Sequence, residues 1–225
     1  MNKTQINKID EHLKMIGQQC DNNPIVLEIG AHIGQDTKRI HNNFPDNVKL
    51  FTFEPDPRNI ETLKLNTFYK EKNIPIIVKA IGDKDGVTSF HLSGGFTKQG
   101  KLFTAGSSLH SPTKILEELR KWRKVAAVIE INICTLDTFF DEHNLDHIDF
   151  IWADVQGAEA DLIRGGRNAL KHTGYLFTEY CNTKHFEGQK TLDELCIMLP
   201  DWEVIDIFSD DVLLKNKNYS FVKTT

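Results

Sequence analysis

The sequence has few cysteines and no excess of basic residues, and each shortage argues against a class of protein. Its four cysteines (Cys20, Cys134, Cys181 and Cys196) form no C-x-x-C pair, so we expect reduced thiols, as in a cytosol-like compartment. Lysine and arginine total 27 against 32 acidic residues, which gives a net charge of −5. This balance disfavours a general nucleic-acid binder, because nonspecific affinity comes from neutralising phosphates.

Long apolar runs are missing as well. Met1 to Lys14 is polar and charged, so the sequence shows no apolar core of a signal peptide. No apolar run approaches the roughly 20 residues that a membrane-spanning helix needs. We therefore expect a cytoplasmic protein with no membrane insertion and no nucleic-acid partner.

The chain does contain enough apolar sequence for one large α/β domain over residues 1–225, because 40% of its residues are hydrophobic. We expect an N-terminal helix in residues 1–23. Residues 93–125 are too long for a simple connection and predict a substrate loop or lid. Further patterns predict helices over 58–69 and 111–124, and strands over 48–53, 74–80, 87–92, 125–133, 149–153, 174–180, 203–208, 212–215 and 219–222.

The stretch from Pro24 to Thr37 organises the rest of the chain. A β-branched apolar run is followed by two glycines and then by a helical pattern, which is the strand-turn-helix unit that binds ligands at the carboxyl end of a parallel strand. The dinucleotide pattern G-x-G-x-x-G fails here, because counting from Gly30 its glycine positions fall on His32 and Gln35. Glu28, at the strand end, repels phosphate and attracts a cation or amine. This combination suits S-adenosylmethionine, which carries an ammonium group and a sulfonium centre.

Two later acidic residues fit the same ligand. Glu54 follows the next predicted strand, 26 residues after Glu28, where a carboxylate accepts hydrogen bonds from both hydroxyls of an adenosine ribose. Asp83 lies in the loop 81–86 after the third strand, where it can accept from the exocyclic amine of adenine. The alternative for Asp83 is ordinary turn chemistry.

Four residues are candidates for the catalytic base. Asp154 and Glu179 end two further predicted strands, so we expect both at the carboxyl edge of the sheet. Either one can accept a proton from an acceptor, or the two together can hold a divalent metal. His110, in the segment Gly106-Ser107-Ser108-Leu109-His110, and His32 are rival bases.

Several of these motifs together resemble the FkbM family of S-adenosylmethionine-dependent methyltransferases. They are residues 26–34, Phe53-Glu54-Pro55, Gly106-Ser107-Ser108-Leu109, Thr135-Leu136-Asp137 and residues 154–159 with Gly165-Gly166. The resemblance implies a Rossmann-like class I methyltransferase fold, with a seven-stranded, mostly parallel sheet, an antiparallel last strand and helices on both faces. It implies O-methylation of a sugar, glycan or small natural product. The family pattern has Glu where this chain has Gln156.

The expected cofactor-binding set combines the motifs with the resemblance. It comprises Glu28, Gly30, Ala31, His32, Gly34, Asp36, Thr37, Phe53, Glu54, Pro55, Ala80, Ile81, Gly82, Asp83, Ser107, Ser108, Asp154 and Val155. Among the candidate bases we favour Asp154. Alternatives are N-methylation of an amino sugar or small amine, a catalytically silent cofactor-binding module and a nicotinamide-dependent oxidoreductase. The acceptor, the need for a metal and the oligomeric state stay open.

Overall fold

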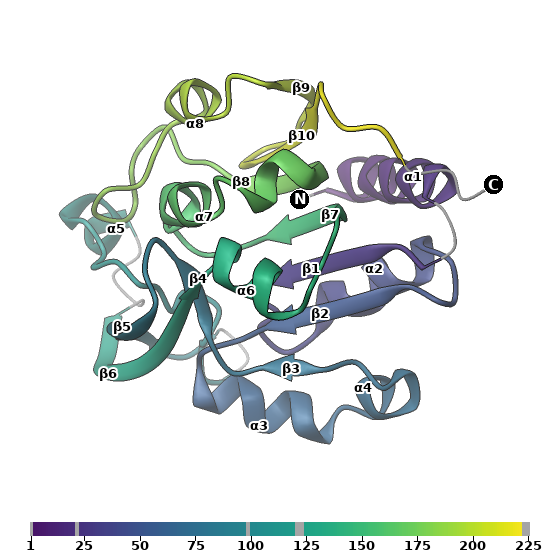
Figure 1. Ribbon diagram of the computed structural model, residues 1–225. Helices are drawn as coiled ribbons and strands as arrows, with labels where there is room; N and C mark the ends of the chain where they lie inside the picture. Colours follow the sequence, from purple (N-terminus) through teal and green to yellow (C-terminus); the bar gives the residue numbers. More distant parts are fainter. Residues whose placement is uncertain (1, 21–22, 98–99, 120–123, 222–225) are drawn as a thin grey trace.

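The computed structural model describes residues 2–20, 23–97, 100–119 and 124–221 (Figure 1). A seven-stranded sheet has the order β3-β2-β1-β7-β8-β10-β9. Neighbours from β3 to β8 are parallel, and β10 runs antiparallel to β8 and β9. These strands are β1 (Ile25–Ile29), β2 (Lys49–Phe53), β3 (Ile76–Ile77), β7 (Ile148–Ala153), β8 (Thr173–Glu179), β9 (Trp202–Ile207) and β10 (Asp211–Asn216). The expected mostly parallel sheet with an antiparallel last strand is confirmed.

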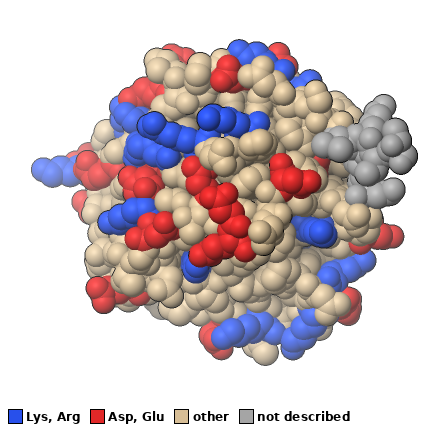
Figure 2. Space-filling model, in the orientation of Figure 1, with Lys and Arg blue, Asp and Glu red and all other residues tan. Residues whose placement is uncertain are grey.

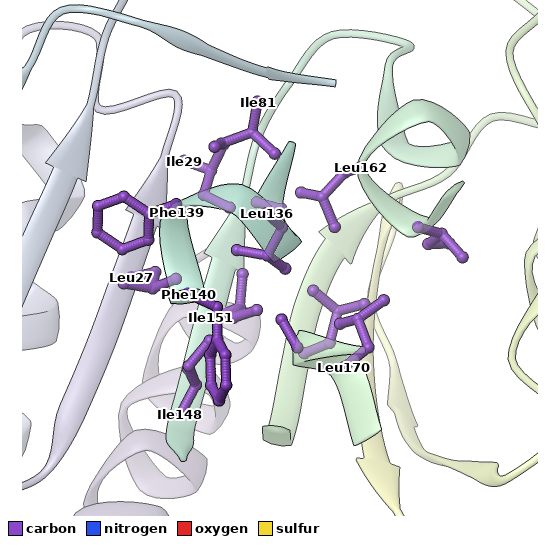
Figure 3. Packing of buried hydrophobic residues seen from close by; sticks show 14 of the residues in the cluster. Leu27, Ile29, Ile81, Leu136, Phe139, Phe140, Ile148, Ile151, Leu162 and Leu170 are labelled. Atoms are coloured by element: carbon purple, nitrogen blue, oxygen red, sulfur yellow. The ribbon is translucent and has the colours of Figure 1, made fainter. Parts of the chain in front are cut away.

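Helices cover both faces of this sheet because successive strand residues point to opposite sides. Val26 packs in one core cluster with residues of α1 (Lys3–Gln19), α2 (Gln35–Asn43), α3 (Pro57–Leu65) and α4 (Thr67–Lys72). Leu27 and Ile29 pack in a second cluster with residues of α6 (Leu136–Glu142), α7 (Glu159–Gly165), η1 (Ala169–His172) and α8 (Leu192–Met198). Figure 3 shows this second cluster, in which Leu136, Phe139 and Phe140 of α6 pack against the sheet.

The N-terminal helix is present as expected. α1 begins after Asn2, whose side chain accepts from the backbone N–H of Gln5 in a capping box. Its stripe of Ile9, Leu13 and Ile16 is fully buried and fixes the helix against the sheet. No helix in the described part of the chain combines the length and the apolar character that crossing a bilayer requires.

A second sheet stands beyond the carboxyl ends of the parallel strands (Figure 1). It has the order β4-β6-β5 and is built from β4 (Ala80–Gly82), β5 (Gly86–Gly94) and β6 (Lys124–Thr135). The single strand predicted over 74–80 is therefore wrong. After Ile77 the chain turns, with the N–H of Lys79 donating to the carbonyl of Ile77, and leaves the main sheet. β4 then pairs with β6, a partner that lies far away in sequence.

Three other predicted elements differ from the structure. The helix predicted over 58–69 is two helices, because the Asn66 side chain accepts from the N–H of Phe68 and begins α4. Of the helix predicted over 111–124, the structure has α5 (Lys114–Leu119), and residues 120–123 lie outside the described residues. Residues 219–221 form no strand, and residue 222 lies outside the described residues. The Tyr219 hydroxyl instead donates to Asp149, at 3.0 Å.

Candidate active site

A cavity lies where the carboxyl ends of β1, β2 and β7 face the second sheet and the loop 104–109. This is the position at which open α/β sheets bind their ligands. Its walls are formed by Ile29, Gly30, Ala31, His32, Gln35, Asp36, Phe53, Glu54, Pro55, Asn59, Lys79, Ala80, Ile81, Phe90, Thr104, Ala105, Ser107, Leu109, Trp152, Asp154, Val155, Gln156 and Ala158.

The turn after β1 depends on glycine at position 30. Gly30 has φ +94°, and a Cβ there would lie 2.0 Å from the carbonyl oxygen of Asp154. No other residue fits such an approach. The N–H groups of Gly30 and Ala31 both donate to the carbonyl of Phe53, each at 2.9 Å. The turn is thereby fixed between the ends of β2 and β7.

Glu54 is a buried carboxylate in the cavity wall. It accepts hydrogen bonds from the N–H of His32 at 2.7 Å and the N–H of Asp56 at 2.8 Å. The side-chain amide of Asn59 adds a third contact at 3.3 Å. Burial raises the pKa of Glu54 to about 7, although these hydrogen bonds oppose the shift. Its orientation is therefore set before any ligand arrives.

Glu28 does not line the cavity, which departs from the expectation of a direct ligand contact. Its side chain accepts from the Thr37 hydroxyl at 2.6 Å, and that hydroxyl also contacts the Tyr69 hydroxyl at 2.7 Å. Burial raises the pKa of Glu28 to about 8, so the group is mostly neutral at pH 7. The physical reason is strand alternation: Glu28 shares the α1 and α2 face with Val26, whereas the cavity takes the next residue, Ile29.

Asp154 and Glu179 meet at the end of β7 and β8, as the sequence predicted. They are linked by Gln156, whose side-chain nitrogen donates to Asp154 at 2.7 Å and to Glu179 at 2.9 Å. Burial raises the pKa of Asp154 to about 6 and raises that of Glu179 well above its usual value. Asp154 and Gln156 line the cavity, and Glu179 lies behind them.

The loop 104–108 is fixed over the cavity by polar contacts. A ring nitrogen of His32 lies 2.8 Å from the Thr104 hydroxyl. The Ser107 hydroxyl donates to the fully buried carboxylate of Asp56 at 2.8 Å, and Arg58 forms a paired contact with the same carboxylate, through Nε at 2.9 Å and Nη2 at 2.6 Å. Ser107 thus anchors the loop as well as lining the cavity.

His110 and Asp83 lie outside the cavity, on a chain of charged groups along its outer side. His110 contacts Asp161, which also binds Arg164, and Arg164 lies 3.6 Å from Asp83. The hydrogen bond to Asp161 raises the pKa of His110, which favours the protonated form of this histidine. Asp83 turns away because β4 belongs to the second sheet and contacts α7. The predicted adenine contact of Asp83 does not match this placement.

A second cavity of about 450 Å³ lies on the other side of the loop 106–110. It is bounded by α5, by β5 and β6, and by Phe186, which packs against Gly157 beside the Gln156 turn. Its walls are His91, Ser93, Gly106, His110, Pro112, Leu116, Glu117, Lys124, Val125 and Phe186. Most of these residues fall in the predicted insertion 93–125.

The structure thus brings together twelve residues of the expected cofactor set, and all of them line the first cavity: Gly30, Ala31, His32, Asp36, Phe53, Glu54, Pro55, Ala80, Ile81, Ser107, Asp154 and Val155. The other six (Glu28, Gly34, Thr37, Gly82, Asp83 and Ser108) stand behind the walls. Ser108, for instance, donates to the carbonyl of Gln156 at 2.6 Å.

Sequence reasoning missed several lining residues. Asn59 and Lys79 had a usable signal, since Asn59 follows the predicted strand 48–53 and Lys79 directly precedes the predicted site residue Ala80. Phe90 and Thr104 had none, because only the second sheet and its loop bring them over the cavity, whereas Leu109 belongs to the motif Gly106-Ser107-Ser108-Leu109 and had one. Within the residues that the structure describes, no group of three or more His, Cys, Asp or Glu side chains is arranged to hold a metal ion.

Comparisons with known proteins agree with this geometry. The model of the methyltransferase FkbM domain matches residues 28–219. The 2-O-methyltransferase NoeI of Sinorhizobium fredii is 34% identical over 197 residues, which cover 86% of this chain and 79% of NoeI.

Two solved structures share the fold at low identity. The O-methyltransferase TomG of Streptomyces achromogenes, in complex with SAM, has a TM-score of 0.52 and 13% identity, covering 95% of this chain and 79% of TomG. An O-methyltransferase of Bacillus cereus, in complex with SAH, has a TM-score of 0.51 and 14% identity, covering 95% of this chain and 80% of that protein. The chain therefore belongs to the FkbM family and is an S-adenosylmethionine-dependent methyltransferase.

Proposed function

We propose that this protein transfers a methyl group from S-adenosylmethionine to a hydroxyl oxygen of a sugar-containing acceptor. The observation that carries the proposal is the cavity in which the Gly30 turn, the buried carboxylate of Glu54 and Asp154 meet. The relative NoeI, named as a 2-O-methyltransferase, supports oxygen as the methylated atom.

The residues of the cavity fit the parts of this cofactor. Glu54 is held by its three hydrogen bonds in an orientation that suits the two ribose hydroxyls. Phe53, Pro55 and Ile81 form an apolar wall suited to adenine, with Leu109 closing it from the loop. Gly30 leaves room for the amino-acid part, and Asp36 offers a carboxylate for its ammonium group. When bound, the cofactor supplies an electrophilic methyl group.

Asp154 is the base in this proposal. A hydroxyl must lose its proton as its oxygen is methylated, and a positioned carboxylate with a pKa near 6 is ionised at neutral pH and able to accept it. Holding both reactants in one cavity supplies much of the rate, because the step becomes effectively unimolecular. Glu179 does not line the cavity and is linked to Asp154 through the side chain of Gln156. His110 lines the second cavity.

The second cavity is the proposed acceptor site. It offers an aromatic side chain, Phe186, beside polar groups on two walls, His91 and Lys124 among them, which is the mixture that sugar rings bind. Its base adjoins the Gln156 turn through the contact of Phe186 with Gly157. The segments 111–113 and 185–187, which pair through two backbone hydrogen bonds of 2.8 and 2.9 Å, close its end.

Isothermal titration calorimetry with S-adenosylmethionine and S-adenosylhomocysteine tests cofactor binding. A screen of sugar and nucleotide-sugar acceptors with radiolabelled cofactor, followed by analysis of the methylated atom, tests the reaction. We expect micromolar binding and an O-methyl product. An N-methyl product would favour the amine alternative, and binding without turnover on any acceptor would favour a catalytically silent module. Absence of binding to both ligands would refute the proposal.

A further inference from the structure

Gln156 occupies an unusual position between two buried carboxylates. It lies in the turn between β7 and α7 with φ +50°, in the left-handed region that side chains rarely adopt. In this conformation the Gln156 side chain lies over the ends of β7 and β8. One nitrogen donates to Asp154 Oδ1 and to Glu179 Oε2, which uses both hydrogens that a carboxamide carries.

The amide brings the two carboxylates close together. Since each accepting oxygen lies within 2.9 Å of the same nitrogen, the two oxygens are less than about 6 Å apart. The groups that act on this pair from neighbouring elements are also acidic. They are Glu28 on β1, Asp36 on α2, Glu159 on α7, Asp210 just before β10 and Asp211 at its start.

Such a pair cannot hold two full negative charges at low cost. Like charges at close range in a buried site push one of the two groups toward its protonated form. The amide of Gln156 is neutral, so it satisfies hydrogen bonds without cancelling charge. The directions of the pKa shifts agree with this, since Asp154 and Glu179 are both raised, first by burial, and the charge of Asp154 raises the pKa of Glu179 further.

We propose that Gln156 is a positioning residue that holds Asp154 and Glu179 as a pair carrying one proton, and that the pair releases this proton when a cation enters the cavity beside Asp154. The proposal rests on the proposed function, in which that cation is the sulfonium of S-adenosylmethionine. A positive charge beside Asp154 stabilises the doubly ionised pair by Coulomb attraction.

This proton exchange matches the balance of the reaction. The acceptor O–H and the S–CH₃ bonds break, an O–CH₃ bond forms, and one proton must leave the oxygen. The doubly ionised pair accepts it through Asp154 and returns to the singly protonated form. That form is suited to the product S-adenosylhomocysteine, which has lost the sulfonium charge. The pair therefore distinguishes cofactor from product by charge.

The test is calorimetric titration at pH 6.5 in two buffers of different ionisation enthalpy, phosphate and imidazole, with each ligand in turn. The difference in heat between buffers gives the number of protons exchanged. For the wild-type protein we expect S-adenosylmethionine to release about one proton more than S-adenosylhomocysteine, because any proton that Glu54 loses on meeting the ribose is common to both ligands. Equivalently, the ratio of the Kd for S-adenosylhomocysteine to the Kd for S-adenosylmethionine rises up to tenfold for each pH unit between 5.5 and 7.5.

Variants separate the role of Gln156 from general damage. Gln156→Leu removes the bridging amide, and Gln156→Glu replaces it with a third carboxyl. We expect both to change the proton release and to shift its pH midpoint, whereas Gln18→Leu on the exposed side of α1 leaves both unchanged.

Two results would overturn the inference. One is equal proton release for the two ligands in the wild-type protein, which needs no variant to fold. The other is unchanged proton release in Gln156→Glu or Gln156→Leu. If neither ligand produces heat, the proposed function itself fails, which is a different outcome from binding without a difference in protons.

Discussion

Glu28 and Glu54 were both expected to contact the ligand, and the structure separates them. Both follow or end apolar strands, and both are almost fully buried. Glu54 lines the cavity, while Glu28 faces Thr37 on the opposite side of β1. A shift of one residue along a strand reverses the face. The sequence therefore predicted two acidic residues at neighbouring strand ends, but its prediction that both meet the ligand holds for the placement of Glu54 and not for that of Glu28.

The role of Glu54 gives a prediction at this scale. Glu54→Gln replaces one acceptor oxygen with an amide NH₂ group, which cannot accept the hydrogen bond from the N–H of His32 or Asp56. The change also removes the negative charge. We expect the affinity for S-adenosylhomocysteine to fall at least tenfold, about 1.4 kcal/mol, because hydrogen bonds from ribose hydroxyls to a charged acceptor are lost. Calorimetric titration measures the change.

The matched control is Glu61→Gln, which makes the same chemical change on the exposed surface of α3, where the side chain is 73% exposed. Its affinity for S-adenosylhomocysteine is expected to equal that of the wild-type protein. If Glu54→Gln also binds with unchanged affinity, Glu54 does not contact the ligand.

At the scale of elements, the second sheet is the feature that sequence reasoning did not assemble. Its strands were recognised as apolar segments, and β5 and β6 were predicted nearly in full. The pairing of β4 with β6 was not predicted. The two strands lie about 50 residues apart in the sequence, and no local pattern indicates that they pair. For the same reason the placement of the loop 104–108 over the cavity came only from tertiary contacts.

The anchoring of that loop can be tested with Ser107→Ala. The change removes the hydroxyl that donates to Asp56, a contact worth about 1 kcal/mol. We expect the backbone amides of residues 103–109 to exchange with deuterium about fivefold faster, as measured by mass spectrometry, since local opening becomes easier by that amount.

Ser111→Ala serves as the control, because Ser111 is exposed and its hydroxyl makes a long 3.3 Å contact with His91. Equal exchange rates in Ser107→Ala and in the wild-type protein would mean that Arg58 and His32 hold the loop without Ser107.

At the scale of the whole molecule, the protein carries buried acidic groups with raised pKa values. Burial raises the pKa of Glu28 to about 8 and those of Glu54, Glu159 and Asp211 to about 7. The protein otherwise bears mixed surface charge, with acidic and basic side chains interspersed over the face shown in Figure 2. The pH dependence of folding is therefore expected to come from these buried groups.

A raised pKa means that the folded state binds the proton more tightly than the unfolded state. The resulting stability is fully present below the unfolded pKa near 4.5 and is lost as pH rises through the folded value of about 8. We expect Tm to fall between pH 5 and pH 8.

We also infer that the chain unfolds as one domain, because α1 packs across β7, β8 and β10 in a common core. A single transition is therefore expected in calorimetry.

Glu28→Gln tests the largest of these contributions, on the order of 5 kcal/mol. It keeps an acceptor for Thr37 and cannot ionise, so we expect a higher Tm than wild type at pH 8 and little difference at pH 5. Glu71→Gln, at an exposed position of α4, controls for loss of one negative charge. A Tm that is unchanged at both pH values in Glu28→Gln would show that Glu28 is not the group that titrates.

The sequence by itself determined the alternation of strands and helices, the glycine turn after β1 and the placing of Glu54, Asp154 and Glu179 at strand ends. These features follow from local periodicity and from the steric needs of single residues. Only the tertiary structure decided which side chains face the cavity, that Gln156 joins two carboxylates, and that the second sheet covers the site. Those outcomes depend on contacts between segments far apart in the chain, whose free energies no local pattern records.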